Sequence, residues 1–214
     1  MDLVAGSDCS AFVNLARMIV ADGHGGIVLI VPNESGEWEK SLSPFPYKLT
    51  KPDTHLPDAI RAQLREESEN MNDSFELEKS NVTADVKSRI INRVMLTHAD
   101  VLKEVRTVAS LAAVDGAIVM TRDLRVVGFG ATIIVNESKA PNVFIESFEK
   151  KSQRIKPALL KETGGTRHQS ATRFVNMYKD TIALIVSQDQ HLAVVHWDAR
   201  QQRLIFTKSV DWFL

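Results

Sequence analysis

Apolar residues at helical spacing open the chain and lead into a short, continuously apolar segment. One face of a predicted helix over residues 10–20 carries Phe12, Leu15, Ala16 and Ile19. The glycine-rich residues 22–26 can end this helix, because glycine readily adopts the left-handed conformation of a helix C-terminus. Residues 27–31 are all apolar and stop at Pro32, which is typical of a strand buried on both faces. A helix followed by a buried strand indicates a layered α/β or α+β fold.

Prolines and polar residues dominate the next part of the chain. Residues 33–57 contain four prolines and predict an extended excursion with one short strand near residues 47–49. Pro57 suits the first turn of a helix, and residues 58–68 carry a thin apolar stripe. Residues 69–80 are mostly polar and predict a loop.

Two further helices are predicted between this loop and the middle of the chain. The first, over residues 82–96, has an apolar face formed by Val82, Val86, Ile90 and Val94. The second, over residues 98–113, has an apolar face formed by Val101, Val105, Val108 and Ala112. Thr97 stands between them and is interpreted as the cap of the second helix.

Strand patterns follow. Residues 114–121 lead from a helix into an apolar strand, and residues 125–135 predict a long strand. Gly128 and Gly130 inside that strand indicate a bulge or a close backbone approach. Residues 136–162 are predicted to be an irregular connection.

The last part of the chain predicts one helix and three strands. The helix has an apolar face formed by Ala171, Phe174, Val175 and Tyr178. Apolar runs predict strands at residues 181–187, 192–197 and 203–207, the last two forming an antiparallel hairpin. The whole pattern predicts a mixed α/β (α+β) fold, with a central mixed β-sheet flanked by helices. We expect a single domain over residues 1–214, with an inserted or divergent helical segment at about 33–108.

Composition narrows the classes of partner. The 26 lysines and arginines nearly balance the 27 aspartates and glutamates, so no global basic field favours nucleic acid as a partner. No apolar run approaches the roughly 18 residues needed to cross a bilayer, and the N-terminus has no signal-peptide pattern. The single cysteine, Cys9, cannot form an internal disulfide, which fits a reducing compartment. We therefore expect a cytoplasmic location without membrane insertion.

The most informative stretch is Gly164-Gly165-Thr166-Arg167-His168, which stands directly before the last predicted helix. Thr166 is interpreted as the N-cap, and the glycines allow a tight entry into the helix. A helix N-terminus offers unpaired backbone N–H groups and a positive dipole end, so with Arg167 it suits an anion such as phosphate. The alternative is a simple helix cap with a surface arginine.

Asp115 supplies a second chemical group. It stands where a helix leads into a strand and is followed by the small residues Gly116 and Ala117. A carboxylate there suits a divalent metal or the activation of a hydroxyl, although a solvated turn aspartate is the alternative. A metal-holding acid together with a phosphate-holding loop is what nucleotidyl transfer requires.

The two motifs resemble a known family. Asp115-Gly116-Ala117 and Gly165-Thr166-Arg167-His168 are similar, in this order, to the Asp-Gly-Ala and Gly-Thr-Arg-His-Arg motifs of the diadenylate cyclases. Residues 181–187 also resemble the family's last strand, which ends in a serine. The resemblance covers roughly residues 11–31 and 109–206.

This resemblance implies a function and a set of site residues. It implies condensation of two ATP molecules into cyclic di-AMP with Mg2+ or Mn2+, at a site completed by a face-to-face homodimer. Asp115, Arg167 and His168 would be catalytic, with Asp115 also binding metal. The nucleotide would be held by Gly116, Ala117, Gly165, Thr166, Gln169 and Ser187.

Three positions depart from the family pattern. Gln169 replaces the second arginine, and a neutral hydrogen bond to phosphate is about half as strong as a charge-assisted one. Val114 stands where a membrane-anchored subgroup has a metal-binding histidine. Gln188-Asp189 follows Ser187 where a glutamate pair is common, and Asp189 is the expected substitute metal ligand. The runner-up hypothesis is therefore a nucleotide-binding sensor or regulatory domain with weak or no turnover, and a third is a structural protein.

Overall fold

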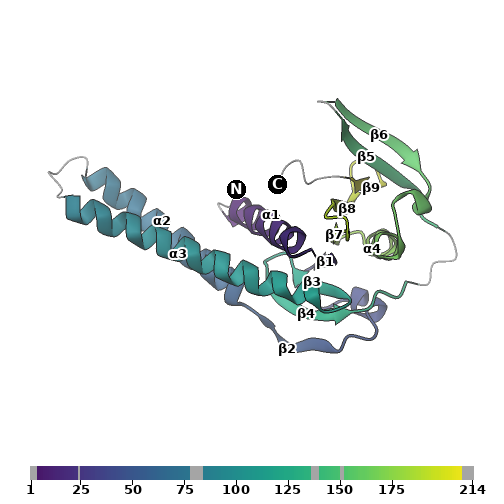
Figure 1. The fold of residues 1–214 in the computed structure, drawn as a ribbon, viewed down its shortest axis with the longest axis horizontal. Coiled ribbons are helices and arrows are strands. Elements are labelled where there is room, and N and C mark those ends of the chain that lie inside the picture. Colours follow the sequence, from purple (N-terminus) through teal and green to yellow (C-terminus); the bar gives the residue numbers. More distant parts are fainter. Residues whose placement is uncertain (1–3, 24, 78–83, 136–139, 150–151, 209–214) are drawn as a thin grey trace.

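The helices and strands form a three-layered structure around one sheet (Figure 1). The computed structural model describes residues 4–23, 25–77, 84–135, 140–149 and 152–208. The helices are α1 (Val4–Asp22), α2 (His55–Leu77), α3 (Ala84–Ser110) and α4 (Thr166–Met177). The strands are β1 (Gly26–Val31), β2 (Tyr47–Asp53), β3 (Ala117–Thr121), β4 (Val126–Ala131), β5 (Val143–Glu149), β6 (Ser152–Ala158), β7 (Ile182–Val186), β8 (Leu192–Asp198) and β9 (Arg203–Thr207). Short 3-10 helices are η1 (Glu37–Ser41), η2 (Leu111–Ala113) and η3 (Leu160–Glu162).

The sheet is mixed, as predicted. Within the described residues the strands follow the order β2-β4-β3-β1-β7-β8-β9-β5-β6. The central strand β1 pairs in parallel with β3 and antiparallel with β7, and β5 pairs in parallel with β9. The predicted hairpin of the last two strands is confirmed, because β8 and β9 pair antiparallel. The predicted fold class, a mixed α/β fold with a central sheet flanked by helices, is therefore confirmed.

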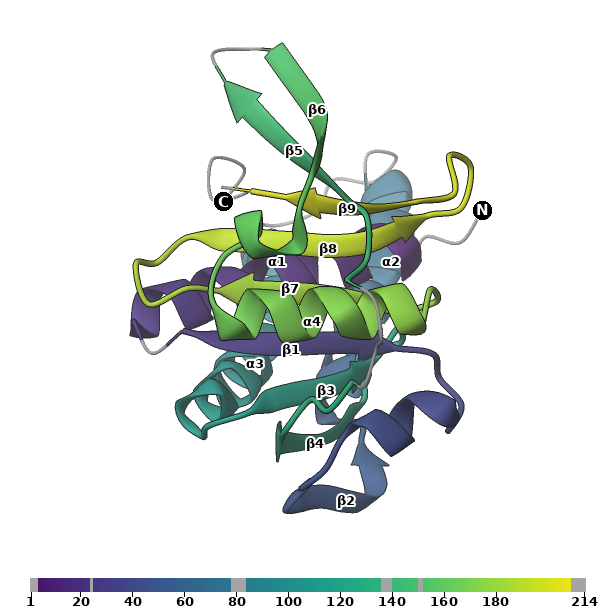
Figure 2. The same ribbon diagram turned by 90° about the vertical axis from the view of Figure 1, so that its right-hand side faces the viewer.

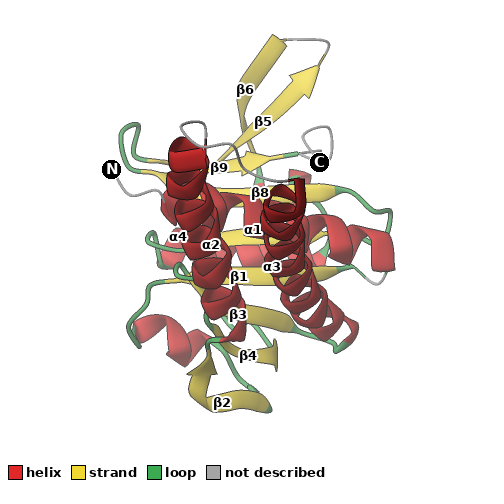
Figure 3. Ribbon diagram, turned by 90° about the vertical axis from the view of Figure 1, so that its left-hand side faces the viewer, coloured by secondary structure: helices red, strands yellow, loops and turns green. Residues whose placement is uncertain are grey.

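Helices cover both faces of the sheet. Figure 2 shows α4 on one face, and Figure 3 shows α2 and α3 in front of the other, with α1. Leu29 and Phe206 belong to the core beneath α4, whereas Val28 belongs to the core beneath the other three helices. All six residues of β1 are buried, so the prediction of a strand buried on both faces is confirmed. Each such large apolar side chain contributes about 1.5–3 kcal/mol when it leaves water.

The helical prediction for residues 58–113 is partly wrong. The helix α2 continues to Leu77, so the predicted loop is helical over residues 69–77, and residues 78–80 lie outside the described residues. Thr97 lies inside the single continuous helix α3, so no helix begins after it. Figure 1 shows α2 and α3 side by side, extending away from the sheet as a pair. Pairing of the two helices outweighs the small helix-propensity cost of one threonine, about 0.5 kcal/mol. None of the described helices has the length and apolar character needed to cross a membrane.

The predicted irregular connection at residues 136–162 is also wrong, because it contains the hairpin of β5 and β6 at one edge of the sheet. Residues 154–157 of β6 are all exposed, so this strand lacks the two-residue apolar alternation that marks a half-buried strand. The strand predicted at residues 125–135 ends earlier, at Ala131. The close backbone approach predicted at Gly128 is confirmed, since a Cβ there would lie 2.5 Å from the carbonyl oxygen of Tyr47.

Candidate functional site

The ends of several strands lie together beside the N-terminus of α4, and this side of the sheet, defined by strand ends and not by an outermost strand, is called an edge below. Ile27 pairs with Ala117 in the parallel β1–β3 ladder, so both strands begin at this edge. Gly26 pairs with Val186 in the antiparallel β1–β7 ladder, so β7 ends there. Figure 2 shows α4 beginning at the same end of the sheet. Topology therefore brings the residues before β3, the residue after β7 and the first turn of α4 to one edge.

The first turn of α4 differs from the prediction at its cap. Gly165, with extended backbone, is the N-cap, and Thr166 is the first helical residue rather than the cap. The N–H of Gln169 donates to the carbonyl oxygen of Gly165 at 3.1 Å and closes the first turn. No side chain caps this end of α4. The first backbone N–H groups therefore remain available to an anion.

Asp115 and Arg167 meet at this edge although they are 52 residues apart. The Nη2 atom of Arg167 donates to Oδ1 of Asp115 at 3.3 Å. The side chain of Asp115 is 96% exposed and that of Arg167 is 41% exposed, so both remain open to a ligand. Exposed pairs of this kind contribute only about 0–1 kcal/mol. The pair therefore orients the two groups without locking them together.

A cavity of about 290 Å3, here called the first hollow, opens beside this ion pair. Five of the residues predicted from the motifs line it, namely Asp115, Gly116, Ala117, Thr166 and Arg167. Ala131, Thr132, Ile133 and Ser170 also line it and were not predicted. Ser170 follows Arg167 by one helical turn, a spacing that could have identified it. Residues 131–133 could not be identified from sequence, because their place depends on the β3–β4 pairing.

A smaller cavity of about 200 Å3, the second hollow, lies on the other side of the α4 N-terminus. His168, Ser187 and Lys208 are among its lining residues. Ser187 accepts a hydrogen bond from the backbone N–H of His191 at 3.1 Å through its hydroxyl oxygen. Its hydroxyl proton therefore remains available to a ligand. Lys208, which the motifs did not indicate, also donates to the carbonyl oxygen of Glu162 at 2.7 Å.

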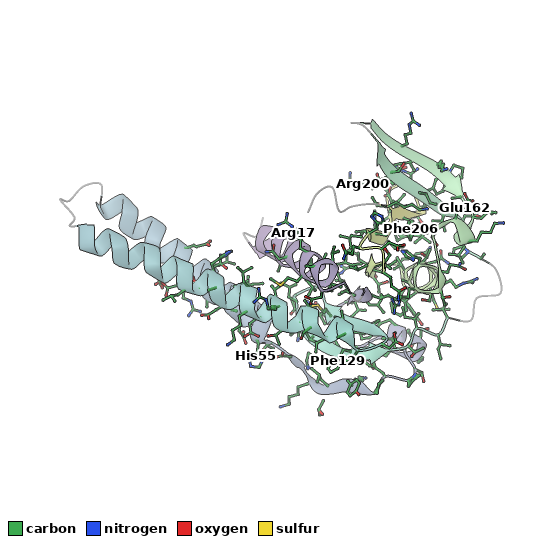
Figure 4. The ribbon with its side chains drawn as sticks, in the orientation of Figure 1. Arg17, His55, Phe129, Glu162, Arg200 and Phe206 are labelled. Atoms are coloured by element: carbon green, nitrogen blue, oxygen red, sulfur yellow. The ribbon has the colours of Figure 1, made fainter. Side chains whose placement is uncertain are left out.

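His168 lines the second hollow and is half-buried. The centre of its ring lies 5.9 Å from that of Phe206, and Figure 4 shows Phe206 among the interior side chains. Burial lowers the pKa of His168 below its ordinary value, and the charges of Lys208 and Arg167 lower it further. A neutral imidazole can donate or accept a hydrogen bond, so His168 suits contact with a phosphate oxygen through its N–H.

Three predicted site residues line neither hollow among the residues described. Gly165 is the N-cap of α4. The Nε2 atom of Gln169 donates to the carbonyl oxygen of Gly164 at 2.9 Å, so this amide is directed into the preceding loop. Asp189 is exposed in the turn that follows β7.

Gly25 contributes to the site because it has no Cβ. Its φ is +67°, and a Cβ there would lie 3.3 Å from Nη1 of Arg167 and 3.0 Å from the carbonyl oxygen of Val186. Glycine therefore lets the turn before β1 pass beneath the guanidinium. From sequence this glycine was interpreted only as part of a helix end.

A divalent metal fits this edge only if the phosphates of a bound nucleotide complete its coordination. No cluster of three or more histidine, cysteine or acidic side chains capable of holding a metal occurs in the described ranges. Mg2+ commonly binds through one or two carboxylates together with substrate phosphates. The exposed carboxylate of Asp115, in the same hollow as the first residues of α4, fits that mode of binding.

The site thus offers one open carboxylate, one guanidinium, uncapped helix amides and a partly buried imidazole along one edge of a sheet. No protein-family model and no curated protein matches the chain.

Proposed function

We propose that the chain is a diadenylate-cyclase-like nucleotidyltransferase that condenses two ATP molecules into cyclic di-AMP and pyrophosphate. The observation that carries the proposal is the meeting of Asp115 and Arg167 at 3.3 Å in one hollow. Two separate motifs supply these residues, and each was expected to serve the same reaction. Their convergence favours a shared nucleotide site over two unrelated turns.

In this proposal different residues contact the phosphates, the ribose and the metal ion of bound ATP. The amides at the start of α4 and Arg167 hold phosphate oxygens, and His168 and Ser187 lie where further phosphate oxygens extend. Asp115 lies next to the ribose 3′-hydroxyl and accepts its proton as that oxygen attacks the α-phosphate of the other ATP. A bound Mg2+ or Mn2+, held by Asp115 and the phosphates, would supply charge compensation.

The proposal requires two copies of the chain. Each 3′-hydroxyl must attack the α-phosphate of the other ATP from the side opposite the leaving pyrophosphate. A single protomer contains one copy of the first hollow, which would hold one of the two ATP molecules. A face-to-face homodimer would place two such hollows opposite each other. The open position of Asp115 suits this arrangement, because its side chain is 96% exposed. The use of ATP and the single Cys9 favour a cytoplasmic location.

A second candidate function is nucleotide binding without turnover, as a sensor or regulatory domain of the same fold. The hydrogen bond from Gln169 to the carbonyl oxygen of Gly164 favours it, because that amide is engaged within the loop. Position 169 then supplies no positively charged side chain to the phosphates.

One experiment separates these functions. The chain is incubated with ATP and Mn2+, the products are analysed by mass spectrometry, and Asp115→Asn serves as the control. Cyclic di-AMP from the wild type alone supports the enzyme. If neither protein makes product but ATP or cyclic di-AMP raises the Tm of the wild type more than that of Arg167→Ala, the first hollow binds nucleotide without turnover. If millimolar nucleotide changes neither product nor Tm, both functions are excluded.

A further inference from the structure

A third cavity lies at the opposite edge of the sheet from Asp115. We call it the far hollow; it has a volume of about 430 Å3, compared with about 290 Å3 for the first hollow. Arg122, Lys179, His196, Trp197 and Gln202 are among its lining residues. The N–H of Arg122 donates to the carbonyl oxygen of Val31, which marks the end of β1. The far hollow therefore lies where β1 and β3 end, whereas the first hollow lies where they begin.

Trp197 provides a flat aromatic surface in the far hollow. Its side chain is partly buried and packs against the core beneath α4. The Nζ atom of Lys179 lies 3.9 Å from the centre of the Trp197 ring. Lys179 pairs with no carboxylate in the part of the chain that the structure describes. Its ammonium group is therefore held by the face of the Trp197 ring. Because the lysine side chain is flexible, the ammonium group can move from the ring to a bound anion.

Arg122 supplies a second cation. Its Nη2 atom donates to the carbonyl oxygen of Asp180 at 2.5 Å and lies 3.9 Å from Oδ1 of Asp180. The Asp180 carboxylate is 89% exposed and the Arg122 side chain is 54% exposed, so water weakens their attraction. The remaining N–H groups of this guanidinium are free to bind an oxyanion in a bidentate manner.

We propose that the far hollow is a second, separate nucleotide-binding site. The base stacks on the indole of Trp197, and the phosphate is held by Lys179 and Arg122. His196, which pairs with Ile182 across β7 and β8, offers a ring nitrogen to the base or ribose. The volume falls in the range of about 300–1,000 Å3 that is common for small-molecule sites. Stacking of bases on aromatic side chains beside cationic groups is the chemistry by which proteins hold single-stranded nucleic acids, and it needs no metal. The proposal does not depend on the reaction proposed for the first hollow.

The test uses the full chain and AMP, with the indole N–H signal of Trp197 observed by NMR and assigned through Trp197→Phe. AMP is expected to shift this signal in a saturable manner, in the wild type and equally in Arg167→Ala. Adenosine alone and inorganic phosphate alone are each expected to bind at least about fivefold more weakly, because each makes only half of the contacts. An unmoved signal at 10 mM AMP, or a shift lost in Arg167→Ala, overturns the proposal.

Charge reversal gives the second arm of the test. Lys179→Glu is expected to weaken AMP binding at the Trp197 signal at least about tenfold. Lys103→Glu is the matched control, because Lys103 is an exposed lysine of α3 on the opposite face of the sheet. Both side chains are exposed, so the Tm should be nearly unchanged in both variants. Equal AMP affinities for the two variants would overturn the role of Lys179 and with it the proposed site.

Discussion

The Nη2 atom of Arg167 lies 3.3 Å from Oδ1 of Asp115, joining the first turn of α4 to the residue two positions before β3. The pair is exposed on the Asp115 side and contributes at most about 1 kcal/mol. In the proposed site, a ligand phosphate would compete with Asp115 for the guanidinium, and a metal ion would compete with Arg167 for the carboxylate. Binding of phosphate and metal should therefore assist each other, because each ligand releases the group that the other needs.

Replacing Asp115→Asn tests this relationship directly. The variant should lose cyclic di-AMP formation by at least about 100-fold, because the carboxylate is removed from the reacting hydroxyl. Without metal, ATP should bind as tightly as to the wild type or up to about fivefold tighter, because Arg167 is released from the pair. Titration calorimetry in EDTA measures this affinity, with both proteins also carrying Lys179→Glu so that binding at the far hollow is weakened equally.

Asp100→Asn is the matched control for Asp115→Asn, because Asp100 is an exposed aspartate of α3, on the opposite face of the sheet from α4. It should leave product formation and metal-free ATP binding at the first hollow unchanged. Weaker metal-free binding in Asp115→Asn would contradict the competition between carboxylate and phosphate.

Gly116→Ala should destabilise the fold and remove activity together. The φ of Gly116 is +114°, and a Cβ there would lie 2.5 Å from the carbonyl carbon of Gly130. Backbone cannot yield as a flexible side chain does, so we expect the free energy of unfolding to fall by at least about 2 kcal/mol. Urea denaturation measures this change. Gly165→Ala is the control, because a Cβ at Gly165 meets no heavy atom within 4 Å, and its free energy of unfolding should fall by less than about 1 kcal/mol, the cost of alanine at an N-cap.

The sequence predicted those elements whose pattern arises from burial. Strand β1 was recognisable because every residue from 27 to 31 is apolar, and burial on both faces requires that. The hairpin of β5 and β6 was missed because consecutive exposed residues in β6 carry no alternation. The continuity of α3 was missed because Thr97 is a locally acceptable cap, and only packing against α2 decides that the helix continues.

The candidate site was predictable in its residue types but not in its geometry. The two motifs named Asp115 and Arg167, whereas their contact depends on the parallel pairing of β1 with β3. Gly25 and Lys208 were not predicted as site residues, because they approach the site from distant segments and belong to neither motif. The cap at Gly165 was missed because glycine and threonine both serve as N-caps, and backbone conformation decides between them.

His168 should give the protein a pH-dependent stability. Its folded-state pKa lies below the ordinary value of 6.5, because burial and the neighbouring charges of Lys208 and Arg167 disfavour the imidazolium. The unfolded chain therefore binds more protons than the folded chain as the pH falls through 6.5, and the free energy of unfolding decreases. His168→Gln cannot take up this proton. The loss of Tm between pH 7.5 and pH 5.5 should therefore be smaller in the variant, and an equal loss in both proteins would contradict the assignment to His168.

Gln169→Arg should strengthen the hold on phosphate. The Gln169 side chain donates to the carbonyl oxygen of Gly164, and an arginine can make the same bond with one N–H while offering others to a ligand. A charge-assisted hydrogen bond exceeds a neutral one by about 1 kcal/mol, so ATP should bind about fivefold more tightly, measured by calorimetry with Mn2+. Gln190→Arg, in the exposed turn after β7, is the matched control for added charge. An equal gain in both variants would mean that net charge alone raises affinity. A gain confined to position 169 would place that side chain within reach of the phosphates.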